Sequence, residues 1–490
     1  MKKLYNKMEI SARPPCRELP WERVDRMNGF ESNLLDGKTR LHFVGIGGSG
    51  MFPLVQILHA VGYEITGSDA GEGDIVDRER AMGIPVYRGH AAENVHGTQL
   101  VVYTAAILPG NPELAEARRL GIPCVERSVL LGYVANTYPR PVCIAGTHGK
   151  TTTTAMLTQV MVQAGTDPAA VIGGKLPLLD AYGRYGAGRE IIVEACEYHN
   201  TFLHLVPYLS VILNIDDDHL EFFGSMENLK AAFRRFALLT QNTVVANLDD
   251  ANTLEAVRDV DRHMVTFGIE STADVRAVNV AEYRPSFYAF DVQVQGAKGV
   301  HIRLGVPGRH NVYNALAAYV CATMCGCTPE QCAAGIEAFR GAGRRFEFLG
   351  EVNGVTIADD YAHHPTELEA TLKAAKAMDY KQVWAVFQPF TYSRTQMLME
   401  DFARVLPLAD HVVLTEIMGS RERAEDYTVR TADLAARIPG SVWFQTFGQV
   451  ADYVLAHARP GDLVITLGCG DIYKAARLMM QKGAEKAQQA

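Results

Sequence analysis

The sequence lacks any apolar run near the roughly 20 residues that a membrane-spanning helix needs. Its first residues, MKKLYNKMEISARPPCRELPW, also lack the apolar segment of a secretory signal peptide. A basic excess is missing too, because 47 Lys and Arg accompany 56 Asp and Glu, for a formal net charge of −9. Nucleic-acid phosphates attract clustered Lys and Arg, so this balance argues against a nucleic-acid partner. We expect a cytoplasmic protein without membrane insertion, and its oligomeric state is left open.

Zinc-type cysteine spacing is absent as well. Four of the nine cysteines lie close together, at Cys321, Cys325, Cys327 and Cys332, but common zinc sites do not have this spacing. The first two lie four residues apart in the apolar stretch YNALAAYVCATMCG. We therefore interpret the group as small, buried, reduced side chains, in agreement with a cytoplasmic protein.

Apolar strand-like runs alternate with helix-like segments along most of the chain, a pattern typical of parallel sheets covered by helices. At 490 residues the chain is too long for one core. We predict an α/β fold of three domains after a polar extension at 1–39. They are a Rossmann-like domain at 40–138, a central P-loop ATPase-like domain at 139–340 and a Rossmann-like C-terminal domain at 341–490. Within the central domain, FYAFDVQVQGAKGVHIRLGV alternates with period two and predicts a hairpin.

The first glycine cluster, Gly45-x-Gly47-x-x-Gly50, lies between a predicted strand and a predicted helix. Backbone N–H groups and a helix N-terminus in this arrangement favour a diphosphate. Asp69 follows 24 residues after Gly45, at the end of the next strand, where a carboxylate suits a ribose. The alternative is a tight turn that needs glycine for packing alone. The motif does not identify the nucleotide, and NAD is the default only by analogy of fold.

The second cluster, AGTHGKTTT, resembles a phosphate loop whose opening glycine is absent, since Ile144 stands five positions before Gly149. Gly146 and Gly149 still allow the backbone to wrap an anion, Lys150 supplies a cation and Thr151 offers a hydroxyl to Mg²⁺. The alternative is an ordinary strand-to-helix turn with a surface lysine. We predict a shortened loop that binds a nucleotide.

Acidic side chains follow two neighbouring strands of the same predicted domain. VEACE offers Glu194 and Glu197, and NIDDDH offers Asp216–Asp218 and His219. Carboxylate and imidazole groups beside a phosphate loop suit Mg²⁺ or Mn²⁺, whereas an acidic triplet alone is more often a helix cap. In the third domain, DDYAHHP and QPFTYSR place His363 and Arg394 at strand ends, a plausible rim for an anionic substrate.

Eight motifs occur in the order expected of the Mur ligases: GIGGSGM, AGTHGKTTT, VEACE followed by NIDDDH, GRHNVYNALAA, GAGRRFE, DDYAHHPTE, QPFTYSRT and LGCGDI. Residues 40 to about 478 resemble this family, and most of all the branch that adds L-alanine. The resemblance implies ATP-dependent joining of L-alanine to UDP-N-acetylmuramate through an acyl phosphate, in peptidoglycan precursor synthesis. It also implies a UDP-sugar, rather than NAD, in the first domain, and a divalent metal, Mg²⁺ or Mn²⁺, beside ATP.

The resemblance assigns residues to each ligand. The UDP-sugar is expected at Gly45, Gly47, Gly48, Ser49, Gly50, Met51, Ser68, Asp69 and Thr104. ATP is expected at Gly146, Thr147, His148, Gly149, Lys150, Thr151, Thr152, His310, Asn311, Asn314, Arg344 and Arg345. The metal is expected at Thr151, Glu194 and His219. The amino acid is expected at Tyr361, His363 and Arg394. Lys150, His363 and Arg394 are the expected catalytic residues, with His363 as a candidate base for the amine.

Two positions depart from the family pattern. Phe390 stands where members of this branch usually carry His, which leaves the local contacts to L-alanine or phosphate open. Arg234 lies fifteen residues after His219, where some Mur ligases use a carbamylated lysine, a feature not expected of the alanine-adding branch. Three alternatives stay open: a recycling ligase that attaches a tripeptide, a dinucleotide-dependent dehydrogenase and a non-catalytic nucleotide-binding regulator.

Overall fold

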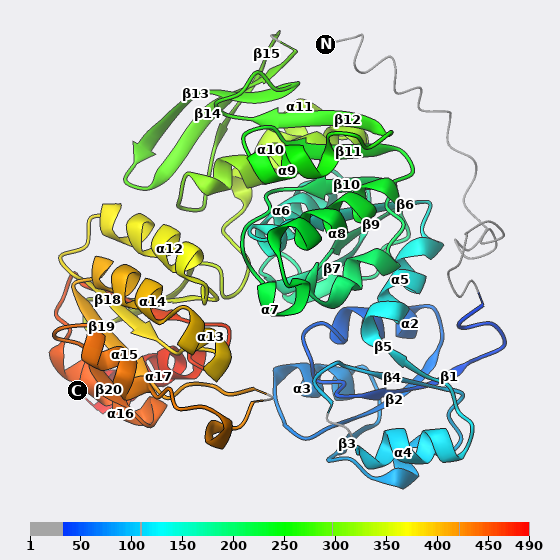
Figure 1. Cartoon of the computed structure of the whole chain (residues 1–490), viewed down its shortest axis with the longest axis horizontal. Coiled ribbons are helices and arrows are strands. Elements are labelled where there is room, and N and C mark those ends of the chain that lie inside the picture. The colour runs from blue at the N-terminus through cyan, green and yellow to red at the C-terminus, as the bar shows by residue number, and fades with distance from the viewer. Residues whose placement is uncertain (1–32, 108–109, 296, 421, 490) are drawn as a thin grey trace. The chain divides into compact units, whose positions relative to one another are not determined.

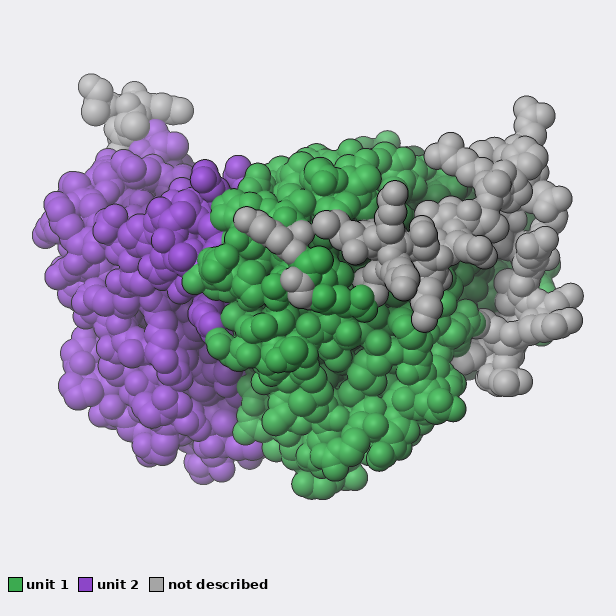
Figure 2. Space-filling model, turned by 90° about the horizontal axis from the view of Figure 1, so that it is seen from above, with its two compact units in different colours: residues 1–280, 290–302, 312–339 green, residues 281–289, 303–311, 340–490 purple. Residues whose placement is uncertain are grey.

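The computed structural model describes residues 33–107, 110–295, 297–420 and 422–489 (Figure 1). Three sheets, each combined with helices, confirm the predicted α/β fold class. The chain divides into two compact units (Figure 2). The first comprises Met1–Val280, Phe290–Ile302 and Val312–Phe339, and the second Ala281–Ala289, Arg303–Asn311 and Arg340–Ala490. The first unit therefore holds the first sheet and most of the second, whereas parts of β13, β14 and β15 belong to the second unit. Most of the predicted extension at 1–39 lies outside the described residues.

The first sheet has the strand order β3-β2-β1-β4-β5 and is parallel throughout. Its strands are β1 (Arg40–Val44), β2 (Glu64–Asp69), β3 (Val86–Arg88), β4 (Leu100–Tyr103) and β5 (Cys124–Glu126). Its helices are α2 (Phe52–Ala60), α3 (Asp74–Ala81), η2 (Ala92–Val95), α4 (Pro112–Arg119) and α5 (Arg127–Thr137). Leu41 and Phe43 of β1 pack into one hydrophobic core, and Val44 packs into another with Val101. Burial on both faces explains the nearly continuous apolar strands.

The second sheet has the order β15-β14-β13-β12-β11-β10-β6-β9-β7-β8. Its strands are β6 (Arg140–Ala145), β7 (Ala169–Leu176), β8 (Ala181–Arg184), β9 (Glu190–Glu194), β10 (Leu209–Ile212), β11 (Thr243–Asn247), β12 (His263–Gly268), β13 (Val275–Arg284), β14 (Phe287–Val294) and β15 (Ala297–Arg303). Its helices are α6 (Lys150–Gln163), η3 (Tyr198–His204), α7 (Leu220–Phe223), α8 (Met226–Leu238), α9 (Ala251–Val257), α10 (His310–Met324) and α11 (Pro329–Ala338). Strands β14 and β15 are neighbours, in agreement with the predicted hairpin.

Strands β6, β9 and β10 determine where the central site forms. They are parallel, and their registers align Ile144 with Glu194 and Ala145 with Ile212. The segments that follow these strands therefore emerge at one edge of the sheet. This is the edge at which parallel sheets bind ligands.

The third sheet has the order β16-β17-β21-β18-β19-β20, with only β16 antiparallel to its neighbour. Its strands are β16 (Glu347–Val352), β17 (Val355–Asp360), β18 (Val383–Phe387), β19 (His411–Thr415), β20 (Val442–Phe444) and β21 (Leu463–Leu467). Its helices are α12 (Pro365–Ala377), α13 (Tyr392–Met397), α14 (Met399–Val405), η4 (Leu406–Leu408), η5 (Ala424–Asp426), α15 (Thr431–Arg437), α16 (Phe447–His457) and α17 (Tyr473–Gln489).

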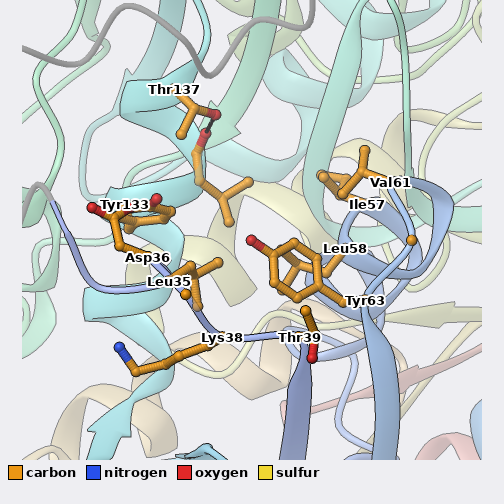
Figure 3. Close-up of a pocket in the computed structure, with 13 residues that line it drawn as sticks. Leu35, Asp36, Lys38, Thr39, Ile57, Leu58, Val61, Tyr63, Tyr133 and Thr137 are labelled. Atoms are coloured by element: carbon orange, nitrogen blue, oxygen red, sulfur yellow. Dashed lines mark hydrogen bonds between the residues drawn. The ribbon is translucent and has the colours of Figure 1, made fainter.

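The described helices include none long and apolar enough to cross a membrane. The cysteines 321, 327 and 332 are buried and free, as expected, and Cys325 is half-buried. A cavity of 480 Å³ lies beside α2 and α5, with Tyr63 and Tyr133 in its wall (Figure 3). Its lining runs through 35–39, 57–63 and 133–137 and includes none of the predicted site residues. We therefore place the candidate active site elsewhere.

Candidate active site

The first glycine loop is held by the end of β2. The backbone N–H groups of Gly45 and Ile46 donate to the Ser68 carbonyl at 2.8 and 3.1 Å. The Gly47 N–H donates to Asp69 Oδ2 at 3.0 Å, and a side chain at Gly47 would lie 2.8 Å from Val76. Asp69 Oδ1 accepts from the Gly71 N–H at 2.9 Å. The Asp69 carboxylate thus shapes the loop, and a contact to ribose remains a prediction.

Other residues predicted for the UDP-sugar differ in their surroundings. The Met51 side chain is buried in the core, and a contact between Met51 and the UDP-sugar remains a prediction. Thr104 lies directly against Gly45, where an added Cβ would be 2.6 Å from its methyl group. The Arg127 guanidinium, which the sequence analysis missed, lies 3.4 Å from a Cβ placed on Gly50. A cation beside a loop of N–H groups suits a diphosphate.

The second loop, Gly146–Gly149, joins β6 to α6. Gly149 has φ +87°, and a side chain there would collide with the Asn314 amide, so glycine is required. Gly146 has φ +142°, and a Cβ there would lie 2.9 Å from Leu213. The backbone therefore runs close to the segment after β10, as a loop that wraps an anion requires. Asn314, predicted from α10, does lie against this loop.

Lys150 begins α6 and turns back over the loop. Its ammonium donates to the carbonyls of Gly146 and Thr147 at 2.6 and 2.9 Å and lies 3.0 Å from Glu197 Oε2. Burial opposes its charge, but the Glu197 and Glu194 carboxylates outweigh burial and raise the pKa of Lys150. The side chain is therefore a fixed cation at the mouth of the loop, the position from which it can neutralise phosphate.

The middle of the loop is fastened to the segment after β10. Asn214 accepts from the His148 N–H at 2.8 Å and donates to the His148 carbonyl at 3.1 Å. Thr147 Oγ1 accepts from the Asp216 N–H at 2.9 Å. His148 Nε2 lies 3.1 Å from Asp216 Oδ2, and this contact lowers the pKa of Asp216. Asp216 thus supports the loop, whereas the sequence analysis considered it for the metal.

Two of the predicted metal ligands meet directly. Thr151 Oγ1 donates to Glu194 Oε1 at 3.0 Å, and the Gly173 N–H donates to Glu194 Oε2 at 2.7 Å. A side chain at Gly173 would collide with this carboxylate. Among the residues described, no three His, Cys, Asp or Glu converge as a metal cage. A hydroxyl and a carboxylate beside a phosphate loop still fit Mg²⁺, which takes few protein ligands and completes its shell with phosphate and water.

His219, the third predicted metal ligand, has a constrained backbone. Its φ is +58°, and its ring packs on Tyr198 with a centroid distance of 4.4 Å. His199 and Asn200 also have positive φ, at 53° and 57°. Left-handed backbone at residues that are not glycine is uncommon and concentrates at functional sites. A metal-binding role for His219 remains a prediction.

A further group of predicted site residues lies around Tyr361, which directly follows β17. The guanidinium groups of Arg344 and Arg345 lie 5.0 and 4.9 Å from the Tyr361 ring. Arg344 also pairs with Asp359 at 2.9 Å and donates to the Gly468 carbonyl at 2.6 Å. Burial raises the pKa of Tyr361 to about 12, so the phenol stays neutral.

His363 is the partner of Tyr361 across a ring distance of 5.7 Å. Its Nδ1 lies 3.2 Å from Glu367 Oε2 and 3.2 Å from the Tyr361 carbonyl. Arg394 lies in α13, which Thr391 caps with its side chain. His310 and Asn311 belong to the second compact unit, and Asn311 Nδ2 donates to the Pro307 carbonyl at 2.7 Å. Their roles toward ATP, like those of His363 and Arg394 toward the amino acid, remain predictions.

Sequence reasoning missed several supports of these sites. Asn214 was detectable, because it is polar and lies two residues after the end of β10, the strand beside β6. Gly173 carried no signal, since its φ is ordinary and its need for glycine comes from Glu194, 21 residues away. Steric requirements of this kind arise only in the folded chain.

Comparison with known proteins adds independent findings. Three protein-family models match parts of this chain. They are described as "Mur ligase family, catalytic domain" (residues 40–139), "Mur ligase middle domain" (144–322) and "Mur ligase, glutamate ligase domain" (344–470). A protein of Alkaliphilus metalliredigens named UDP-N-acetylmuramate–L-alanine ligase is 40% identical over 444 residues, 90% of this chain and 96% of that protein. The protein of the same name from Acetivibrio thermocellus is 40% identical over 448 residues, 90% and 95% of the two chains.

Solved structures are similar over the same length. The crystal structure of the UDP-N-acetylmuramate-alanine ligase of Thermotoga maritima has a TM-score of 0.78 at 28% identity, covering 91% of this chain and 99% of that chain. A murein peptide ligase of Psychrobacter arcticus has a TM-score of 0.72 at 22% identity, covering 90% and 98%. The second likeness concerns the fold alone.

Proposed function

Because the chain belongs to the Mur ligase family, we propose that it joins L-alanine to UDP-N-acetylmuramate with ATP and releases ADP and phosphate. The 40% identity to ligases of that name over 90% of the chain is the observation that carries this proposal. The product is a peptidoglycan precursor. We place the reaction in the cytoplasm, where ATP is available.

We propose that the reaction begins when the muramoyl carboxylate attacks the γ-phosphate of ATP, giving an acyl phosphate and ADP. Helix α6 begins at Lys150, so its first N–H groups face the end of the loop, and the Lys150 ammonium adds a fixed cation. Both counter charge on the transferred phosphoryl group. Thr151, Glu194 and His219 would hold Mg²⁺ or Mn²⁺, and the bound ion supplies further neutralisation of the phosphate oxygens.

The amine of L-alanine then attacks the acyl carbonyl, and phosphate leaves the tetrahedral intermediate. Tyr361, His363 and Arg394 are the residues we propose near the amino acid. His363 is the candidate base for the amine, since Glu367 lies 3.2 Å from its Nδ1 and can orient the ring.

We propose that the first glycine loop takes the diphosphate of the UDP-sugar. The nearby Arg127 guanidinium supports an anion site at the carboxyl edge of the first sheet. The Ser68 carbonyl fixes the shape of the loop by accepting from the Gly45 and Ile46 N–H groups. The domain limits 40–138, 139–340 and 341–490 are part of the same proposal.

Trapping of the acyl phosphate tests the proposal. With UDP-N-acetylmuramate and ATP but no L-alanine, hydroxylamine should convert the intermediate to a hydroxamate with equimolar ADP. A dinucleotide-dependent dehydrogenase would give neither product, and a nucleotide-binding regulator would bind ATP without releasing ADP. Absence of hydroxamate under conditions that support ADP release with L-alanine would contradict the acyl-phosphate route.

A further inference from the structure

The cavity of 480 Å³ beside α2 and α5 has no part in the function proposed so far (Figure 3). Two of the segments that line it lie at the amino edge of the first sheet. Residues 35–39 lead into β1 at Arg40, and residues 61–63 lead into β2 at Glu64. The first glycine loop follows the other end of β1, and a strand of five residues is about 16 Å long. The cavity is therefore separate from the site where we place the UDP-sugar.

Backbone hydrogen bonds fix the walls of this cavity. In the segment before β1, the Lys38 N–H donates to the Leu35 carbonyl at 3.0 Å. At the end of α2, the Tyr63 N–H donates to the Leu58 carbonyl at 3.1 Å. The cavity is therefore preformed, as sites for small molecules usually are.

The floor of the cavity is apolar. Four of its aliphatic residues are at most 3% exposed, namely Leu35, Ile57, Leu58 and Val134. An organic ring placed against them removes apolar surface from water, which favours binding. The volume lies within the range of small-molecule sites. We therefore expect a ligand with an apolar body.

The two phenols in the wall suit a cationic group. In Figure 3 the Tyr63 hydroxyl points toward the side on which Tyr133 lies. Burial raises the pKa of both phenols, to about 12 for Tyr133, and the negative charge of Asp36 adds to the rise. Both phenols are thus neutral at physiological pH. A neutral phenol can accept a hydrogen bond from an ammonium group and can present its ring face to the positive charge.

The two charged side chains of the lining, Asp36 and Lys38, are not equivalent. Asp36 is exposed at the rim, and its charge acts on both Tyr63 and Tyr133. The Lys38 side chain extends away from Tyr63 (Figure 3). A cation bound beside the phenols therefore gains the attraction of the Asp36 carboxylate, whereas an anion there would be repelled by it.

We propose that this cavity is a second ligand site, which binds a small hydrophobic amine. The apolar body lies against Ile57 and Leu58, and the ammonium group lies between Asp36 and the two phenols. None of the substrates of the proposed reaction has this chemistry. UDP-N-acetylmuramate and ATP are anions, and L-alanine carries a carboxylate and only a methyl group. The proposal therefore concerns a further ligand and does not depend on the proposed function.

Titration of the full-length protein with 2-phenylethylamine, which is protonated at pH 7, tests the proposal by saturation-transfer NMR of the ligand. The amine should bind saturably and about fivefold more tightly than 2-phenylethanol, which has the same ring without the charge. The factor corresponds to one ion pair that stays in contact with solvent. Saturating UDP should not displace the amine, because the cavity and the glycine loop lie at opposite edges of the sheet.

Three variants locate the binding. Asp36→Asn should weaken the amine about fivefold and leave 2-phenylethanol unchanged. Lys38→Gln is the matched control in the same segment and should leave the affinity for the amine unchanged. Val61→Trp places an indole in the cavity and should abolish binding of both probes, and Asp36→Asn decides the matter if that protein does not fold.

Three results would overturn the proposal. They are equal affinity for the amine and the alcohol, unchanged affinity for the amine in Asp36→Asn, and displacement of the amine by UDP. The last result would place the amine in the nucleotide site instead of the cavity.

Discussion

The buried carboxyl of Glu79 predicts that the first sheet loses stability as pH rises through the neutral range. Glu79 lies on α3 and is fully buried, and neither of its carboxyl oxygens has a hydrogen-bond partner among the described residues. Burial, reinforced by the negative charge of Asp69, raises the pKa of Glu79 from 4.5 to about 8. The native protein therefore keeps the proton at neutral pH, whereas the unfolded chain releases it.

The sign and size of the effect follow from this difference. A group that binds a proton more tightly in the native state destabilises that state as pH rises above its unfolded pKa. With pKa values of 4.5 and 8, the penalty grows by about 2.5 kcal/mol between pH 5 and pH 7 and levels off above pH 8. In Glu79→Gln this pH dependence disappears, because the side chain no longer titrates.

Urea-dependent hydrogen exchange of peptides from β1, β2 and β4, read by mass spectrometry, measures the stability of this sheet. The difference in unfolding free energy between Glu79→Gln and the unmodified protein should shift by about 2.5 kcal/mol in favour of the variant from pH 5 to pH 7. Asp77→Asn is the matched control on the same helix, where the side chain is 73% exposed, and should show no shift. Parallel pH profiles for the unmodified protein and Glu79→Gln would refute the reasoning.

Three further substitutions probe the central site. Lys150→Ala removes the cation at the loop and should lower hydroxamate formation at least 100-fold, while the affinity for UDP, measured by calorimetry, stays normal. Near-normal turnover in this variant would contradict the role of Lys150 in phosphoryl transfer. Gly173→Ala forces a methyl group against Glu194 and should raise the Mg²⁺ concentration for half-maximal activity about tenfold, with unchanged affinity for UDP. His219→Ala should raise the same Mg²⁺ requirement, and an unaltered metal titration would remove His219 from the proposed ligands.

Much of the site's location could be predicted from the sequence. Apolar strands followed by glycine or acidic residues indicate parallel strands, and parallel strands end at one edge of a sheet. This logic brings Gly146, Glu194 and Asp216 together, and the structure places Glu194 at the end of β9 and the other two after the neighbouring strands β6 and β10. The sequence did not show that these residues have different roles. Asp216 contacts His148 and supports the loop, whereas Glu194 accepts a hydrogen bond from Thr151.

The rest depends on contacts between distant segments. The buried Glu113 carboxylate, for example, contacts His42, Ser68, His90 and Asn94, and no spacing in the sequence links His42 to His90. Likewise, the burial of Glu79 could not be predicted from the sequence, because Glu79 is one of several charged residues in the short helix α3. The division of the region after 280 between two units was also not predicted, since β13 to β15 alternate in the same way throughout.

Release of ADP by the purified full-length protein, measured with a coupled assay, tests the central claim most directly. UDP-N-acetylmuramate, ATP and Mg²⁺ are supplied with L-alanine, with glycine, with a murein tripeptide or with no amino acceptor. We predict stoichiometric ADP release and formation of UDP-N-acetylmuramoyl-L-alanine with L-alanine, and far slower release with the tripeptide. Preference for the tripeptide, or ADP release that continues over many turnovers at the same rate without any amino acceptor, would contradict the account.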